Sequence, residues 1–152
     1  MKAEVIIFPW LALDATPLMS GCNGVQPPNL GVREGRLRPC PLSPNCVSSQ
    51  STDREHYVEP LSYSSPKPGA MAALKKIILQ KKRTKIVNET GTYLHAEFTS
   101  ALWRFVDDVE FSFDESAKLI HMRSASRVGH SDFGVNRKRV EDIRKSWTSS
   151  GR

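Results

Sequence analysis

The feature that most constrains the fold is a stretch in which apolar residues occupy alternate positions. They share one parity and are Trp103, Phe105, Val109, Phe111 and Phe113. Such alternation predicts a β-strand with one apolar face, and residues 114–117 (DESA) are turn formers followed by a return strand over 118–126. Pairing Phe113 with Lys118 would place Glu110 opposite His121 and Asp108 opposite Arg123, so that opposite charges would face each other. The sequence therefore predicts an antiparallel hairpin.

Shorter patterns predict the other elements. Residues 55–63, 84–87 and 93–98 are predicted strands, and residues 70–80 are a predicted helix. A second helix is predicted near the C-terminus, with Ser131 or Asp132 as its N-cap. Its inward stripe is Phe133, Asn136, Val140, Ile143 and Trp147. A chain of 152 residues has the length of one domain. We therefore expect an α+β domain, with an antiparallel sheet of four or five strands and two helices packed on one face.

The N-terminal residues 1–22 are predicted to be a lipoprotein-type signal peptide. Lys2 precedes the apolar stretch 5–13, and Ser20-Gly21-Cys22 places small residues before a cysteine, as in the lipobox of bacterial lipoproteins. Cys22 is the predicted lipidation site, and a buried strand followed by a loop is the alternative. Residues 23–38, with two prolines and three glycines, are predicted to form an extended tether. The single globular domain would then occupy residues 39–152.

The chain contains three cysteines, a number that fits export. If Cys22 carries lipid, Cys40 and Cys46 remain as a pair across a short loop with two prolines, and a disulfide is sterically feasible. Two free thiols are the alternative. No metal site is expected, because two thiols need two further ligands and no second cysteine pair exists. No cofactor is expected either, since the chain has no Walker-type loop, nucleophile elbow or HExxH motif.

One carboxylate falls on the apolar face of the predicted hairpin. Asp107 shares the parity of the apolar residues, and a buried carboxylate needs hydrogen bonds or a cation. Asn136 interrupts the apolar stripe of the last helix in the same way. We predict a ligand-binding or structural polar cluster at one end of the sheet, made of Asp107, Ser124, Arg127, Asp132, Asn136 and Arg137. The alternatives are a bulge that turns Asp107 outward and a polar staple that fixes the helix to the sheet.

Several strings of residues resemble a known family. They are residues 37–50 (LRPCPLSPNCVSSQ), 105–111 (FVDDVEF), 123–129 (RSASRVG) and 132–137 (DFGVNR). In this order they resemble the bacterial and plastid "domain of unknown function 1499" family over about residues 30–147. The resemblance implies an exported or lipid-anchored protein, which agrees with Cys22. It implies no activity and no catalytic residue.

Basic residues gather in parts of the chain, whose net charge is +6. Residues 67–85 contain seven basic residues and no acidic one, and residues 118–152 contain nine basic and three acidic ones. We therefore expect a non-enzymatic binding module for an anionic ligand, lipid headgroup or protein. The alternative is an envelope enzyme that uses the polar cluster.

The signal peptide sets the expected compartment. Lipid on Cys22 would attach the protein to the periplasmic side of a membrane in the cell envelope. By resemblance to known lipoproteins, Asn23 after the cysteine favours the outer membrane over the inner one. The expected partners are the membrane, through the anchor, and an anionic ligand or envelope protein. No nucleic acid is expected, because an exported protein seldom meets one.

Overall fold

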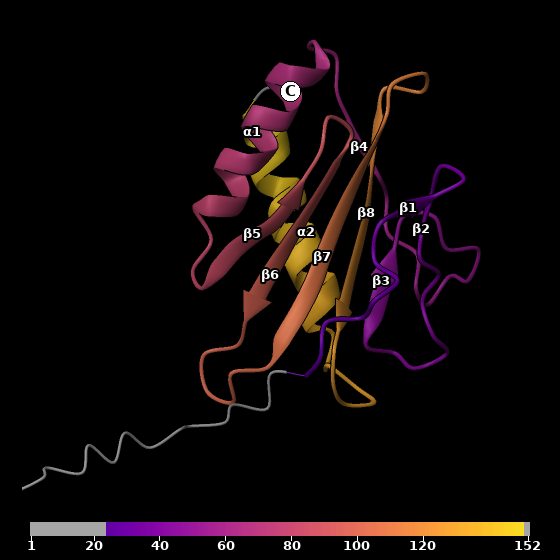
Figure 1. Cartoon of the computed structure of the whole chain (residues 1–152), viewed down its shortest axis with the longest axis vertical. Coiled ribbons are helices and arrows are strands. Elements are labelled where there is room, and N and C mark those ends of the chain that lie inside the picture. Colours follow the sequence, from indigo (N-terminus) through magenta and orange to yellow (C-terminus); the bar gives the residue numbers. More distant parts are fainter. Residues whose placement is uncertain (1–23, 151–152) are drawn as a thin grey trace, which may run out of the picture.

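The computed structural model describes residues 24–150, so the predicted signal peptide and Cys22 lie outside the described residues. Its main feature is a six-stranded antiparallel sheet in the order β3-β8-β7-β6-β5, with β4 also paired to β8 (Figure 1). The strands are β3 (Cys46–Ser48), β4 (Leu61–Ser62), β5 (Thr84–Glu89), β6 (Tyr93–Thr99), β7 (Val106–Asp114) and β8 (Leu119–Ser126). The α+β prediction is confirmed. The sheet exceeds the expected four or five strands because the short strands β3 and β4 both pair with β8.

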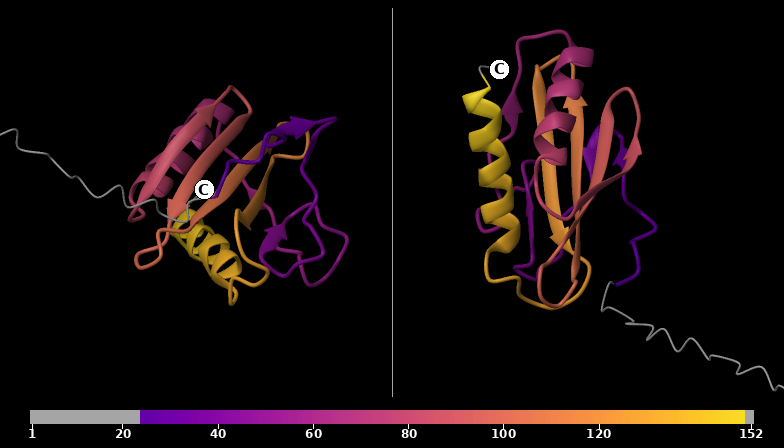
Figure 2. Two further views of the ribbon diagram at one scale, coloured as in Figure 1. Left: turned by 60° about the horizontal axis from the view of Figure 1, so that its bottom comes forward. Right: turned by 90° about the vertical axis from the view of Figure 1, so that its left-hand side faces the viewer.

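Both helices lie on one face of the sheet (Figure 2). They are α1 (Lys67–Leu79) and α2 (Val135–Ser149). Their buried residues join the apolar face of the sheet in one core, with Leu74 from α1, Ile143 from α2 and Phe111 from β7 all fully buried. None of the helices within residues 24–150 is long and apolar enough to span a membrane. The predicted helix stripe is correct from Asn136 onward, but Phe133 precedes α2 and is exposed.

The central hairpin has a register shifted by two residues from the predicted one. Phe111 pairs with Met122, Glu110 with Arg123 and Asp107 with Ser126. The turn lies one residue later than expected because β7 continues to Asp114, whose Oδ1 accepts hydrogen bonds from the backbone of residues 116 and 117. A shift of two leaves each side chain on its predicted face but changes its partner across the strands. β7 also begins only at Val106, so Trp103 and Phe105 lie in the preceding loop.

Residues 55–63 form a strand only at β4, and the rest of this segment is held by α2. Arg137 donates to the carbonyl oxygens of Glu55 (2.7 Å) and Tyr57 (2.8 Å). Arg144 donates to the carbonyls of residues 59 and 60, and Trp147 Nε1 donates to that of residue 62 (2.9 Å). Side chains of α2 take these carbonyls, and the segment pairs with β3 only through an isolated parallel bridge between Tyr57 and Ser48. We call these three side chains of α2, Arg137, Arg144 and Trp147, the clamp, because they hold residues 55–62 through backbone carbonyls.

Residues 24–38, here called the N-terminal strap, lie across the sheet face opposite the helices (Figure 2). Within the strap, β1 (Val32–Arg33) and β2 (Arg36–Leu37) form a small hairpin. The backbone N–H of Gly31 donates to Oε1 of Glu110 (2.7 Å), and Leu37 is buried. The sequence predicts an extended tether here, whereas the structure makes residues 24–38 part of the domain. The reason is that the strap covers charged side chains and supplies some of their hydrogen bonds.

A disulfide joins Cys40, just after the strap, to Cys46 at the start of β3. The two Cα atoms lie 5.6 Å apart, within the usual range for such a bond. The predicted pairing of these two cysteines is confirmed. The bond fixes the end of the strap to the edge of the sheet.

Candidate functional site

The predicted polar cluster forms around Asp107, but its cation is a residue that the prediction did not include. Asp107 is buried, and its Oδ2 accepts a 2.5 Å hydrogen bond from Nη2 of Arg139 on α2. Nη1 of Arg139 donates to Oδ1 of Asn136 (2.6 Å) and to Oγ of Ser124 (3.1 Å). The guanidinium also lies over the ring of Phe98, 5.0 Å from its centroid. One arginine therefore connects the sheet to the first turns of the helix.

Asn136 is the centre of this cluster and is fully buried. Its Oδ1 accepts from Ser124 Oγ (2.5 Å), and its Nδ2 donates to Asp132 Oδ2 (2.8 Å). Nδ2 also lies within hydrogen-bond distance of Ser126 Oγ and of the carbonyl oxygen of Asn45. Asp132 accepts hydrogen bonds from the backbone N–H groups of residues 134 and 136. The N-cap of α2 is Gly134, so the predicted N-cap at Ser131 or Asp132 is wrong. This arrangement is the polar staple that the sequence offered as an alternative.

The other two predicted members lie elsewhere. Arg137 belongs to the clamp on residues 55–62, and Arg127 lies on the opposite face of the sheet. There, Nε and Nη2 of Arg127 donate to both carboxylate oxygens of Asp108 (2.9 and 2.7 Å), and Nη2 also donates to Glu97 (2.5 Å). Arg127 follows β8, so its side chain reaches the face opposite to that of Asp107. The prediction that the six residues converge is therefore wrong for Arg127 and Arg137.

Two charged groups are buried side by side under the strap. In the first, Asp108 accepts from His95 Nε2 (2.8 Å) as well as from Arg127. Burial acts to raise the pKa of Asp108, but the hydrogen bonds from Arg127 and His95 outweigh it and lower that pKa. The hydrogen bond to Asp108 also raises the pKa of Arg127. The result is an ionised carboxylate with a permanent bidentate partner.

The second group is centred on Glu110, which is fully buried. Its Oε1 accepts from the Tyr93 hydroxyl (2.8 Å) and from Gly31 N–H, while Oε2 accepts from Arg123 (3.1 Å). Burial, followed by the charge of Glu110, raises the pKa of the Tyr93 phenol. Burial lowers the pKa of Arg123. The strap supplies one donor to Glu110 and covers the group, whereas Nε of Arg123 is buried without a hydrogen-bond partner.

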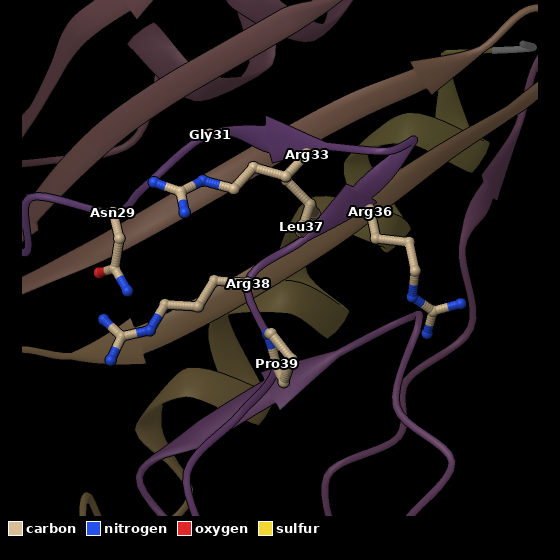
Figure 3. Close-up of a pocket in the computed structure, with 7 residues that line it drawn as sticks. All are labelled: Asn29, Gly31, Arg33, Arg36, Leu37, Arg38 and Pro39. Carbon is tan, nitrogen blue, oxygen red and sulfur yellow. The ribbon is translucent and has the colours of Figure 1, made fainter.

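A third group of cationic side chains lies on the N-terminal strap and, unlike the two buried groups, is open to solvent. The strap lines a pocket of about 270 Å³. Figure 3 shows the guanidinium groups of Arg33 and Arg38 on the same side of the hairpin as the amide of Asn29, whereas Arg36 points the other way. Within residues 24–150, neither Arg33 nor Arg38 forms a salt bridge, in contrast to Arg139 and its carboxylate partner Asp107. Two unpaired guanidiniums beside an amide can bind a carboxylate or phosphate group.

The hairpin that carries these arginines is fixed by Gln50. Its Oε1 accepts from the N–H of Leu37 (2.8 Å), and its Nε2 donates to the carbonyl oxygen of Gly35 (3.1 Å). Arg36 in turn donates to the backbone carbonyl of Gln50 (2.9 Å). Arg36 therefore holds the hairpin in place, and Arg33 and Arg38 are presented on a rigid support.

Sequence reasoning missed both Arg139 and the strap arginines. Arg139 stands three residues after Asn136, a spacing that puts two side chains on the same side of a helix, and this signal was available. The strap contains three arginines within residues 33–38 (REGRLR), but its prolines and glycines favoured a tether. In the part of the chain that the structure covers, no three His, Cys, Asp or Glu side chains are grouped as metal ligands.

The chain matches a known protein family. A family model described as "Protein of unknown function (DUF1499)" matches residues 36–146. No curated protein matches the chain significantly. The matched range includes the staple, both buried charged groups and Arg38, and it begins after Asn29 and Arg33.

Proposed function

The chain belongs to the DUF1499 family of proteins of unknown function, and from this premise we propose that it is an exported, lipid-anchored envelope protein that binds an anionic ligand. The ligand site is the pocket between Arg33 and Arg38. The observation that carries the proposal is the pair of solvent-accessible guanidiniums, without carboxylate partners among residues 24–150, on one side of a fixed hairpin.

The contrast with the other arginines supports a binding role. Arg123, Arg127 and Arg139 each pair with a buried carboxylate, and Arg137 and Arg144 donate to backbone carbonyls. These five side chains are occupied by the fold. The guanidiniums of Arg33 and Arg38 remain available, and a planar guanidinium can form two parallel hydrogen bonds with a carboxylate or phosphate.

Export and anchoring are supported by the cysteines. The Cys40–Cys46 disulfide is typical of an oxidising compartment, and its formation leaves Cys22 without an intramolecular partner. Small residues precede Cys22 after an apolar stretch, as in bacterial lipoproteins. We therefore place the protein on the periplasmic side of an envelope membrane, with the outer membrane favoured by Asn23.

The polar staple does not favour the enzyme alternative. Asp107, Ser124 and Asn136 are buried, and their polar atoms are taken up by hydrogen bonds to one another and to Arg139. A catalytic group has to reach a substrate, and these groups instead contact each other.

Titration with inorganic phosphate, followed by NMR of the folded protein, tests the binding site. We expect saturable shifts at residues 29–38, which the variant Arg33→Gln/Arg38→Gln loses. The control Lys82→Gln/Lys138→Gln removes the same charge from exposed positions outside the pocket and should keep the shifts. Equal loss in both variants would show that net charge, and not the pocket, attracts the anion.

Mass spectrometry of the protein from native membranes tests the anchor. The expected N-terminal peptide begins at a lipid-modified Cys22. Recovery of an intact peptide from Met1 would contradict both the lipid anchor and the removal of the signal peptide.

A further inference from the structure

Large apolar side chains project from two loops at one end of the sheet. Leu102 and Trp103, in the loop 100–105 between β6 and β7, are 77% and 67% exposed. Phe133, in the loop 127–134 between β8 and α2, is 91% exposed. The pairing of Asp107 with both Phe98 and Ser126 brings these loops to the same end of the sheet, at the bottom of Figure 1. We call the two loops together the aromatic end.

The backbone holds these side chains outward. Phe133 has φ 53° and Arg104 has φ 58°, a region that bulky residues rarely adopt. The first loop is closed by two hydrogen bonds between Ser100 and Phe105, of 2.8 and 2.9 Å. Backbone N–H groups of the second loop donate to the side chains of Ser131 and Asp132. Both loops are therefore held by internal hydrogen bonds, and their exposed aromatic side chains point away from the core.

The charge around the aromatic end is positive. Lys82, Arg83 and Arg104 form no salt bridge within residues 24–150, and the two loops contain one acidic residue, Asp132. Arg127 and Lys81 also lie here, but they are paired with Asp108 and Asp142. Arg83 lies beside the first loop, because its Nε donates to the carbonyl oxygen of Thr99 (3.1 Å). At the opposite end of the sheet, the turn 114–118 has two acidic residues and one basic residue. Aromatic residues together with cations fit the interface of an anionic lipid bilayer.

The chain enters the described domain at this same end. In Figure 1 the indigo strap begins near the two loops, and Figure 2 agrees. A Cβ atom on Gly24 would lie 2.8 Å from Cβ of Arg127 and 2.9 Å from Cγ1 of Val128, so Gly24 touches the loop after β8. Cys22 is two residues earlier, and two residues span at most about 7 Å. A lipid on Cys22 would therefore enter the bilayer beside the aromatic end.

We propose that the aromatic end is a membrane-docking surface that lies against an anionic bilayer, with Leu102, Trp103 and Phe133 at the headgroup level. This inference rests on the proposed anchor at Cys22. Because the strap is part of the domain from Gly24 onward, no free tether separates the domain from the membrane. The domain stands directly on the bilayer, and the strap leads from the membrane up to the arginine pocket.

Tryptophan fluorescence of the full-length protein in vesicles tests this orientation. The protein is expressed in a bacterium that processes lipoproteins and is reconstituted in phosphatidylglycerol–phosphatidylcholine vesicles with brominated acyl chains, which quench nearby tryptophans. Trp103 should be quenched and its emission shifted to the blue. The variant Trp103→Phe should lose this signal, because Trp147 of α2 is buried in the core and Trp10 precedes Cys22.

The matched control moves the fluorophore to the opposite end of the sheet. Trp103→Phe/Ala117→Trp places it in the exposed turn after β7, and it should remain unquenched. No quenching of Trp103, or equal quenching at both positions, would overturn the docking surface. Mass spectrometry of the same sample keeps the two proposals apart. An unmodified Cys22 overturns the anchor, whereas anchored protein with an unquenched Trp103 overturns only the orientation.

Discussion

Arg139 on α2 and Asp107 at the start of β7 form a buried ion pair, with 2.5 Å between Nη2 and Oδ2. The pair joins the first turns of the helix to the sheet at the aromatic end. The same guanidinium also contacts Asn136 and Ser124, so a single side chain serves three polar partners.

Removing Asp107 should leave Arg139 buried without its carboxylate. We expect Asp107→Ala to lower the free energy of unfolding by about 3 kcal/mol. The control Glu141→Ala breaks a partly exposed ion pair with Arg144 on the same helix and should cost less than about 1 kcal/mol. Urea unfolding of the three proteins measures both losses. Similar losses in the two variants would contradict a buried role for Asp107.

Arg137 and Asp107 were expected to belong to one cluster, but their variants should behave differently. Arg137→Ala removes the hydrogen bonds to the carbonyls of Glu55 and Tyr57 and should loosen that segment. Hydrogen exchange at Val58 N–H, which donates to the Ser48 carbonyl, should become faster, and exchange at Val109 in β7 should not change. Unchanged exchange at Val58 would show that the clamp does not hold the segment.

The pH dependence of stability should contain a contribution from Asp108. Its pKa is lowered by the hydrogen bonds from Arg127 and His95, which outweigh the effect of burial. This stabilisation is complete above the unfolded pKa of about 4 and is lost as the pH falls through the lower folded pKa. We therefore expect Asp108→Asn to be less stable than the wild type near neutral pH, and the difference to shrink as the pH falls below about 4. Urea unfolding across this pH range measures the difference, and a constant difference would contradict the prediction.

The disulfide should stabilise the domain modestly, because the loop it closes is short. Replacing both cysteines, Cys40→Ser/Cys46→Ser, should lower the free energy of unfolding by about 2 kcal/mol. A reductant should cause a similar loss in the wild type and none in the variant, which provides the control. An effect of the reductant on the variant would mean that another group is responsible.

The sequence predicted the faces of the strands more reliably than the partners of individual residues. Alternation placed Asp108 and Glu110 on one face and Asp107 on the other, and this is correct whatever the register. The register depended on the turn, and Asp114 moved the turn by accepting hydrogen bonds from the residues that follow it. Periodicity carries no information about such a local contact.

The strap shows a second limit of sequence reasoning. Pro27, Pro28 and three glycines are typical of a linker. The strap also contains few apolar residues that could be buried, so the sequence gives little sign that it packs on the domain. Its main attachments are the hydrogen bond from the Gly31 N–H to Glu110 and the hydrogen bond from the Leu37 N–H to the side chain of Gln50. Backbone donors have no residue-type signature, so the partner of Glu110 could not be found from side chains alone. The arginine pocket depends on this placement and was missed with it.

The contacts of the strap and of Asn45 also determine when the fold can be completed during synthesis. Gly31 donates to Glu110, which follows 79 residues later, and the carbonyl of Asn45 accepts from Asn136, 91 residues later. Neither hydrogen bond can form until the later residue has been synthesised. Ribosomes make the N-terminus first, so the earliest part of the domain is among the last to find its partners. Contacts this distant in the chain slow folding, because a long loop must close before they form. A nascent chain that stops before α2 would leave Asp107 without its cation and would leave the carbonyl of Asn45 with only the backbone donor of Ser126. The domain should therefore acquire its stability only when the last helix has been made.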